Sequence, residues 1–223
     1  MRFWGMVVFG VLGTAILLSL GIWQLQRLAW KQEVLRAIES KILAPAVEIP
    51  QTVLPDAHSL LPVRAEGRYK GDTVRVLVSQ KIYGAGYRLI TAFELVDGRT
   101  IMLDRGFTSV RSEMPSTPEG RGQVIGNLQW PQEIDSFTPE NDLAANIWFA
   151  RDVARLAEHL KAEPVLLVLR DSSFETEAAT PLPKMTANIP NDHMNYAITW
   201  FSLALIWLGM SGYFLYRSRD PQS

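Results

Sequence analysis

Long uninterrupted apolar runs lie near both ends of the chain. Residues 3–26 contain no charged side chain before Arg27, and residues 194–216 contain none before Arg217. A helix rises about 1.5 Å per residue, so roughly 20 apolar residues cross the ~30 Å hydrocarbon core of a bilayer. We therefore predict transmembrane helices over residues 3–26 and 193–216. A cleaved signal peptide is the alternative for the first run, but its apolar stretch would be shorter.

Between these runs the pattern changes twice. Helical periodicity continues over residues 25–43, which indicates that the first helix extends beyond the bilayer. Residues 44–62 are rich in proline and predict a linker. After the linker, short runs of β-branched and aromatic residues predict strands over residues 63–69, 73–80, 87–95, 100–107 and 123–130.

Turn and cap residues punctuate this central region. Turns are expected at Gly71-Asp72, at Gly84-Ala85-Gly86 and at Asp97-Gly98, of which the last is the strongest hairpin signal. Asp152 is a suitable N-cap for a helix over residues 152–161, and residues 164–169 are typical of a buried strand.

These elements predict an α+β membrane protein, in which two transmembrane helices flank one mainly antiparallel β domain with one or two short helices. The domain spans residues 27–192, including the linker. The pattern does not distinguish a barrel from a sandwich.

Composition narrows the classes of function. The 223 residues are 48% hydrophobic and 20% charged, with a formal net charge of −1, so binding of nucleic acid through bulk positive charge is excluded. The chain has no cysteine, which excludes disulfide frameworks, thiolate metal sites and cysteine nucleophiles. With only three histidines, a zinc or copper site built from clustered imidazoles is not expected.

The charges near the two spans bear on topology. Basic residues after the first span argue for a cytoplasmic domain, but long segments translocate despite their charge, and Arg217 and Arg219 follow the second span as a stop signal. We expect both termini in the cytoplasm, with residues 217–223 as a tail, and the domain on the outer side. Only two residues precede the first run, which favours a bacterial plasma membrane over an organelle.

The three histidines differ in their surroundings. His58 lies in the linker and His159 on the predicted short helix, and neither has a nucleophile motif nearby, so an enzyme is not expected. His193 stands at the mouth of the second span, after Asn191 and Asp192, either of which can cap that helix. A neutral imidazole there is a suitable iron ligand, and a hydrogen bond to lipid head groups or to the domain is the alternative.

Each span carries a stripe of small residues at helical spacing. Such stripes let two helices approach closely, so we expect the spans to pack antiparallel. On the second span the stripe contains two tryptophans, which either pack against the first span or flank a flat ligand. The stripes consist of Gly10, Gly13, Thr14 and Gly21, and of His193, Ala197, Trp200, Ala204, Trp207 and Ser211.

Antiparallel spans bring the end of the first to the depth at which the second begins. Trp23, Gln24 and Arg27 therefore come near the depth of His193, Tyr196 and Trp200. Together they offer an imidazole, a cation and aromatic walls, as a haem with propionates requires. The alternative for Arg27 is an interfacial anchor whose charged end reaches the head groups.

The two span motifs identify a known family. Residues 20–31, LGIWQLQRLAWK, and residues 188–201, NIPNDHMNYAITWF, resemble the first-span and second-span signatures of the Surfeit-locus cytochrome oxidase assembly family, called Shy in yeast. Between them, Asp104-Arg105-Gly106-Phe107 resembles the family's Asn-Arg-Gly-Trp strand end, with a different residue at the first and last positions.

The resemblance implies an assembly factor for haem–copper cytochrome c oxidase. It implies two spans with the domain on the periplasmic or intermembrane-space side, and in bacterial members binding of haem a and its delivery to oxidase subunit I. His193 matches the family's histidine and becomes the expected axial ligand to the haem iron. Expected partners are subunit I, other oxidase assembly factors, haem a synthase and membrane lipid. A membrane scaffold that holds an oxidase subunit without any cofactor is the alternative.

Overall fold

The computed structural model describes residues 2–175, 178–183 and 189–218 and divides into two compact units. Residues Met1–Glu39 and Thr186–Ser223 form the first unit, which we call the helix pair. Residues Ser40–Met185 form the second, which we call the barrel domain.

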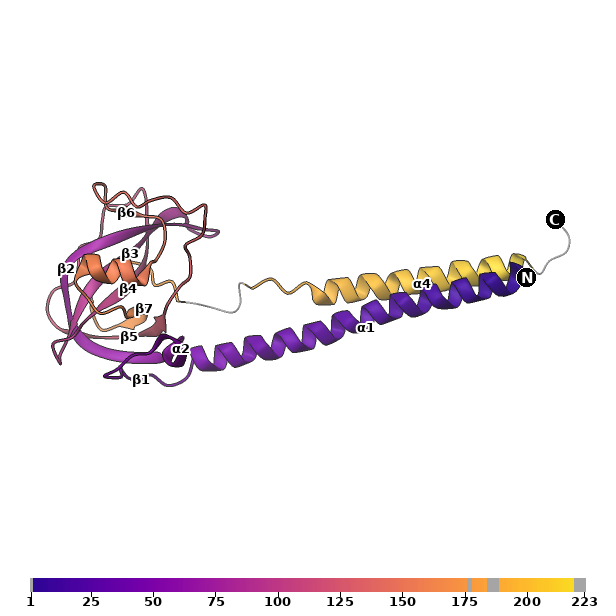
Figure 1. The fold of residues 1–223 in the computed structure, drawn as a ribbon, viewed down its shortest axis with the longest axis horizontal. Coiled ribbons are helices and arrows are strands. Elements are labelled where there is room, and N and C mark those ends of the chain that lie inside the picture. The colour runs from indigo at the N-terminus through magenta and orange to yellow at the C-terminus, as the bar shows by residue number, and fades with distance from the viewer. Residues whose placement is uncertain (1, 176–177, 184–188, 219–223) are drawn as a thin grey trace. The chain divides into compact units, whose positions relative to one another are not determined.

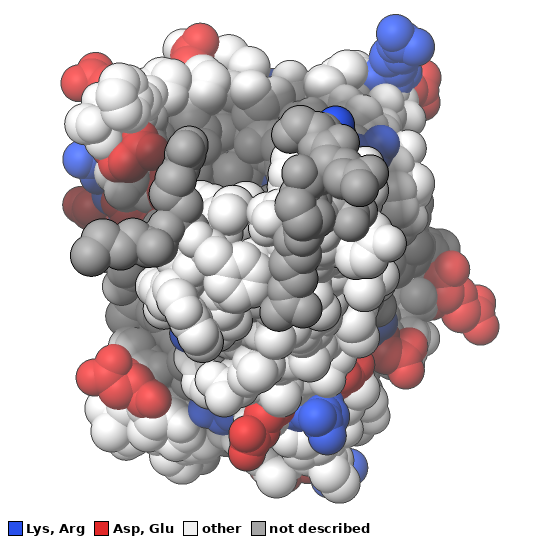
Figure 2. All heavy atoms as spheres, turned by 90° about the vertical axis from the view of Figure 1, so that its right-hand side faces the viewer, with Lys and Arg blue, Asp and Glu red and all other residues white. Residues whose placement is uncertain are grey.

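The helix pair consists of α1 (Arg2–Ile42) and α4 (His193–Arg217). The two helices run antiparallel and side by side (Figure 1). Both are long and apolar enough to cross a membrane, by length and composition. Figure 2 views the molecule from the end of the pair where α1 begins and shows mostly uncharged residues at its centre. The expected extension of the first helix beyond residue 26 is confirmed, since α1 continues without a break to Ile42.

Small residues on α1 hold the two helices close together. A Cβ atom placed on Gly13 would lie 2.4 Å from Nε1 of Trp207, and one on Gly21 would lie 2.7 Å from the Phe201 ring. Trp207 Nε1 also donates a hydrogen bond to the carbonyl oxygen of Gly10, at 3.1 Å. The predicted packing of the two stripes is confirmed, and Trp207 serves this packing.

The barrel domain is built on five main strands whose sheet closes on itself. The strands are β2 (Pro62–Gln80), β3 (Gly84–Leu95), β4 (Thr100–Ser109), β5 (Gly122–Gln129) and β7 (Leu166–Ser172). Neighbours around the ring are β2, β3, β4, β7 and β5, and β5 pairs again with β2. All these pairs are antiparallel except β4 with β7. The ring resolves the choice between barrel and sandwich in favour of a barrel.

Shorter elements complete the domain. Strands β1 (Val47–Glu48) and β6 (Ile147–Trp148) pair in parallel with β2, and α2 (Pro55–His58) is a single helical turn. The segment predicted as an irregular linker therefore contains β1 and α2. Helix α3 (Val153–Leu160) begins as predicted, because the Asp152 side chain accepts hydrogen bonds from two backbone N–H groups of its first turn.

Two of the predicted turns do not occur where they were expected. Gly71 and Asp72 do not separate two strands, because β2 continues through them with a bulge between Lys70 and Thr73. The first hairpin turns at residues 81–83, and Gly84 already belongs to β3. The turn at Gly98 is confirmed, with its N–H bonded to the Leu95 carbonyl at 3.0 Å.

Buried apolar side chains form two clusters on opposite faces of the sheet, one inside the barrel and one on its outer surface, because residues that alternate along a strand point to opposite faces. One includes Phe93, Leu103 and Leu167, all with no exposed surface. The other includes Trp148 and Leu156, through which α3 packs on the sheet.

Candidate functional site

His193 and Gln24 meet at the open end of the helix pair. His193 is the first residue of α4, and Gln24 is buried on the side of α1 that faces it. Nδ1 of His193 lies 2.7 Å from Oε1 of Gln24. An amide oxygen only accepts hydrogen bonds, so Nδ1 carries the proton, and in the neutral ring Nε2 keeps its lone pair. The predicted proximity of these two residues is confirmed.

The start of α4 differs from the expected cap. Asp192 occupies the N-cap position, but its side chain makes no capping hydrogen bond. Instead its backbone carbonyl accepts from the N–H of Tyr196 at 3.1 Å. On the other helix, Lys31 donates a hydrogen bond to the Pro190 carbonyl, and this bond ties the chain entering α4 to α1.

The remaining predicted site residues lie along one edge of the helix pair. A helix turns about 100° per residue, which places Trp23 and Arg27 to one side of Gln24. The same arithmetic places Tyr196 and Trp200 to one side of His193, and because the helices are antiparallel, these two sides coincide. Trp23 is 50% exposed and Tyr196 is 56% exposed, while Trp200 is half-buried.

Arg27 does not point at His193 in this structure. Its guanidinium lies over the ring of Trp30, 4.4 Å from the ring centre, and the side chain is exposed. It shares the edge with Trp23 and is free to turn toward an anionic group there.

The other two histidines have structural surroundings. Nδ1 of His58 accepts a hydrogen bond from the Leu54 N–H at 2.9 Å, at the start of α2. His159 packs edge-on against Trp148, with ring centres 5.4 Å apart.

The barrel domain holds a second polar cluster, which sequence reasoning missed. Asp104, on β4, has no exposed surface. Its Oδ2 accepts from Nε of Arg88 on β3 at 2.7 Å and lies 3.4 Å from Nη1 of Arg151. Arg151 in turn binds both carboxylate oxygens of Glu133. Two cations and two anions thus neutralise one another.

The pKa values in this cluster follow from that pairing. Burial alone would raise the pKa of Glu133, but the hydrogen bonds and positive charge of Arg151 outweigh it and lower the pKa below its ordinary 4.5. Burial would lower the pKa of Arg151, yet the carboxylates of Glu133 and Asp104 raise it. Both groups are therefore charged at neutral pH.

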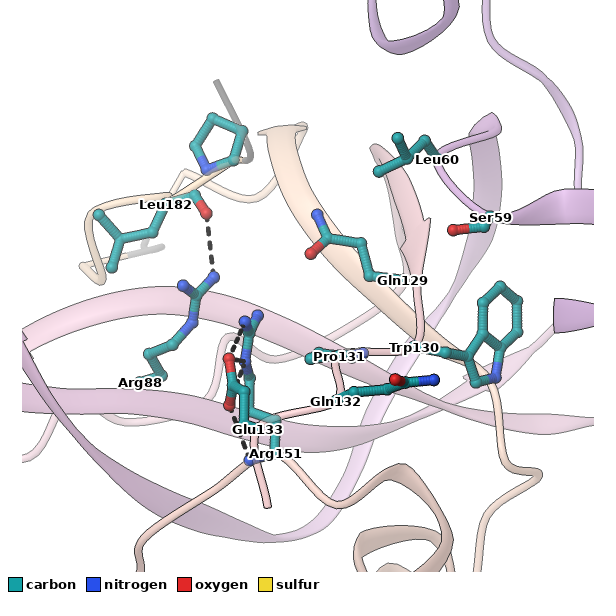
Figure 3. Close-up of a pocket in the computed structure, with 11 residues that line it drawn as sticks. Ser59, Leu60, Arg88, Gln129, Trp130, Pro131, Gln132, Glu133, Arg151 and Leu182 are labelled. Atoms are coloured by element: carbon teal, nitrogen blue, oxygen red, sulfur yellow. Dashed lines mark hydrogen bonds and ion pairs between the residues drawn. The ribbon is translucent and has the colours of Figure 1, made fainter. Parts of the chain in front are cut away.

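A cavity of about 350 Å³ opens beside this cluster (Figure 3). Arg88, Glu133 and Arg151 form its charged wall. Gln129, Gln132 and Ser59 contribute uncharged polar groups, and Trp130, Pro131, Leu60, Leu182 and Pro183 contribute apolar ones.

Arg105 and Gly106 have structural roles next to the same cluster. β4 bulges at Arg105, which is fully buried, and its guanidinium lies 5.2 Å from the Tyr69 ring centre. It also donates to the Ser116 carbonyl at 2.8 Å, so its guanidinium faces the domain interior. Gly106 has φ +112°, and a Cβ atom there would lie 2.1 Å from the Thr180 carbonyl oxygen. A close backbone approach therefore requires glycine at position 106, within β4.

The cavity could not be found from motifs because its residues come from separate segments of the chain. The available signal was Asp104-Arg105 inside an otherwise apolar strand, since a buried charge requires a partner.

Comparisons with known proteins agree with the signatures of the two spans. The model of the SURF1 family matches residues 11–205. The SURF1-like protein of Rickettsia prowazekii is 30% identical over 225 residues, which cover 94% of this chain and 88% of that protein. The SURF1-like protein of Rickettsia felis is 27% identical over 85% of this chain and 88% of its own length. Surfeit locus protein 1 of Homo sapiens is 29% identical over 83% of this chain and 69% of its own length.

Proposed function

Because the chain belongs to the SURF1 family, whose role lies in the assembly of cytochrome c oxidase, we propose that it binds haem a as cargo and assists its insertion into oxidase subunit I. In this proposal the protein is a carrier and not a catalyst. It works in the bacterial inner membrane with both termini in the cytoplasm and the barrel domain in the periplasm. Its partners are subunit I, other assembly factors and haem a synthase.

The hydrogen bond between His193 and Gln24 carries the proposal. Histidines that bind metals generally donate their second ring N–H to a neighbouring acceptor, which fixes both the tautomer and the ring orientation. Nδ1 of His193 has such an acceptor 2.7 Å away, and Nε2 is the nitrogen left to bind iron. The donor set therefore fits a haem iron, which a single imidazole commonly ligates.

The edge of the helix pair supplies the remaining contacts. Trp23, Tyr196 and Trp200 offer flat apolar surfaces for a porphyrin, and Arg27 offers a fork of N–H donors for a propionate. Lys31 is the second cation at this depth, but it already binds the Pro190 carbonyl. We therefore assign the propionate contact to Arg27.

The absorbance spectrum of the purified protein tests this function. The protein is co-expressed with haem a synthase as wild type, His193→Ala and the control His58→Ala. We expect bound haem a in the wild type, its loss by at least about tenfold in His193→Ala and no change in His58→Ala. A colourless wild type that still supports oxidase assembly would contradict haem carriage and favour the scaffold.

The role of Arg27 is tested by haem titration of Arg27→Gln beside Lys31→Gln. A charge-assisted bond to a propionate predicts about ten- to a hundredfold weaker binding for Arg27→Gln and a smaller loss for Lys31→Gln. Equal small effects would show that Arg27 only anchors the helix at the interface.

A further inference from the structure

Gln129 is a buried side-chain amide in the wall of the cavity. It is the last residue of β5, its side chain lines the cavity, and it is only 8% exposed (Figure 3). Its Nε2 has no acceptor among the residues that the structure describes. Buried donors are nearly always satisfied in folded proteins, so an unmade bond of this kind indicates an acceptor supplied from outside.

The charges around the cavity indicate that this acceptor is uncharged. Asp104 and Glu133 together neutralise Arg88 and Arg151, and the four side chains form one series of ion pairs in the order Arg88, Asp104, Arg151 and Glu133. A free anion would have to compete with these fixed carboxylates for the same guanidinium groups. A neutral carbonyl oxygen requires only an N–H donor, and no free positive charge.

The cavity already binds one backbone carbonyl of its own chain. Nη2 of Arg88 donates to the carbonyl oxygen of Leu182 at 2.9 Å. The preceding Thr180 pairs with Phe107 of β4 as an isolated antiparallel bridge, through hydrogen bonds of 2.7 and 2.9 Å. An extended strand of polypeptide therefore lies along one wall, with a carbonyl turned toward the charged cluster.

The rest of the lining suits an apolar side chain. The indole of Trp130 is held in place by its own hydrogen bond to the Pro164 carbonyl at 2.9 Å and by packing on both apolar clusters, and its remaining surface lines the cavity. Leu60 and Pro131 lie beside it in the cavity wall. Aromatic and aliphatic groups around a few fixed donors are typical of sites that hold a peptide or a small neutral ligand.

We propose that this cavity binds an extended, uncharged segment of a partner polypeptide. A backbone carbonyl of that segment accepts the hydrogen bond from Nε2 of Gln129, and an apolar side chain next to it packs on Trp130. The proposal goes beyond haem carriage and does not depend on it, because none of these residues belongs to the helix pair.

A small neutral peptide tests the proposal on the full-length protein in detergent. The probe is N-acetyl-leucine N-methylamide, and N-acetyl-leucine, which bears a carboxylate, is its anionic counterpart. Binding is followed by nuclear magnetic resonance of the ¹⁵N-labelled glutamine side-chain amides and tryptophan indoles. We expect saturable shifts of the Gln129 and Trp130 signals with the neutral probe, and at least about tenfold weaker binding of the anionic one.

Two matched variants identify the donor. Gln129→Met removes the amide and keeps the length of the side chain, and it should weaken binding of the neutral probe at least about fivefold while leaving the melting temperature unchanged or higher. Gln123→Met, on the same strand β5 but exposed and outside the cavity lining, should change binding by less than about twofold. Haem a content should be unchanged in both variants, so this test and the haem test fail independently.

Three outcomes would overturn the proposal. The first is the absence of saturable shifts at Gln129 and Trp130. The second is tighter binding of N-acetyl-leucine than of the neutral probe, which would make the cavity an anion site. The third is unchanged binding of the neutral probe to a folded Gln129→Met variant.

Discussion

The helix pair and the barrel domain use their buried polar groups in opposite ways. In the barrel, the buried Asp104 pairs with Arg88 and Arg151, and the partly exposed Glu133 pairs with Arg151, so each charge has a partner within the domain. In the helix pair, Gln24 takes up only one of the two ring nitrogens of His193. A network in which every charged group has a partner stabilises one conformation, whereas an imidazole with one ring nitrogen left over is available to a ligand. The comparison indicates that variants of the barrel cluster should lower stability and that variants around His193 should lower haem affinity.

The largest effect is expected for Gly106→Val. A β-branched side chain cannot adopt φ +112° without strain, and its Cβ would overlap the Thr180 carbonyl. We expect the free energy of unfolding of the barrel domain to fall by at least about 4 kcal/mol. Urea unfolding followed by the fluorescence of Trp130 and Trp148 measures this.

Gly84→Val is the matched control for this prediction. Gly84 also has positive φ, but the space around it is open, so only backbone strain of about 1–2 kcal/mol is expected. An unchanged melting temperature of Gly106→Val together with lost haem would contradict the separation of the two regions.

Removal of the shared carboxylate should have the next largest effect. Asp104→Ala leaves two guanidinium groups facing each other without the buried charge between them. We expect the barrel to lose about 3–5 kcal/mol of stability, with haem affinity unchanged in the folded fraction. Glu94→Ala, which breaks exposed pairs with Arg68 and Lys70, should cost far less. Similar losses from the two variants would show that the buried network is no stronger than a surface one.

Gln24→Leu tests the helix pair, where a variant should lower haem affinity and leave barrel stability unchanged. Loss of the acceptor frees the His193 ring to rotate and to change tautomer, so haem affinity should fall about ten- to a hundredfold. Barrel stability should not change. Gln26→Leu, on an exposed face of α1, is the control and should leave haem affinity within about twofold. Equal haem binding by Gln24→Leu and wild type would remove the positioning role of Gln24.

The smallest effect concerns pH and Glu133. Its pKa is lowered in the folded protein from 4.5, so its contribution to stability is present above that pH and is lost as pH falls through the lower, folded value. Wild type should therefore be more stable than Glu133→Gln at pH 7, and the difference should shrink below about pH 4.5. Because the Glu133 side chain is 37% exposed, screening by solvent keeps the difference below about 1 kcal/mol. A difference that grows on acidification would contradict this pairing.

Local signals predicted most elements of the fold. The apolar runs, the Asp152 cap and the Asp97-Gly98 turn each act over a few neighbouring residues, and the structure contains all of them. Closure of the barrel could not be predicted, because β2 pairs with β5 and β4 pairs with β7 through residues that are far apart in the sequence. The turn predicted at Gly71 was wrong because the sequence does not distinguish a turn from a β-bulge. Both favour a residue with positive φ, and Gly71 has one within a bulge of β2.

The candidate site shows the same division. The depths of two antiparallel spans are enough to predict that Gln24 comes near His193. They do not predict rotation about the helix axis, so the contact of Gly21 with Phe201 and the stacking of Arg27 on Trp30 appear only in the structure. Gln129 has no local signal at all, because an amide at the end of a strand is ordinary until its surroundings are known.

The choice of an amide at position 24 has a consequence for how firmly a ligand is held. A carboxylate in the same place would draw the ring proton toward itself and make Nε2 a stronger electron donor to a metal. Gln24 orients the ring through a neutral oxygen, 2.7 Å away, and adds no negative charge. Orientation and bond strength are thereby set separately. For the haem carriage proposed above, we expect such a site to select the geometry of the haem and still to release it to an acceptor that binds it more tightly.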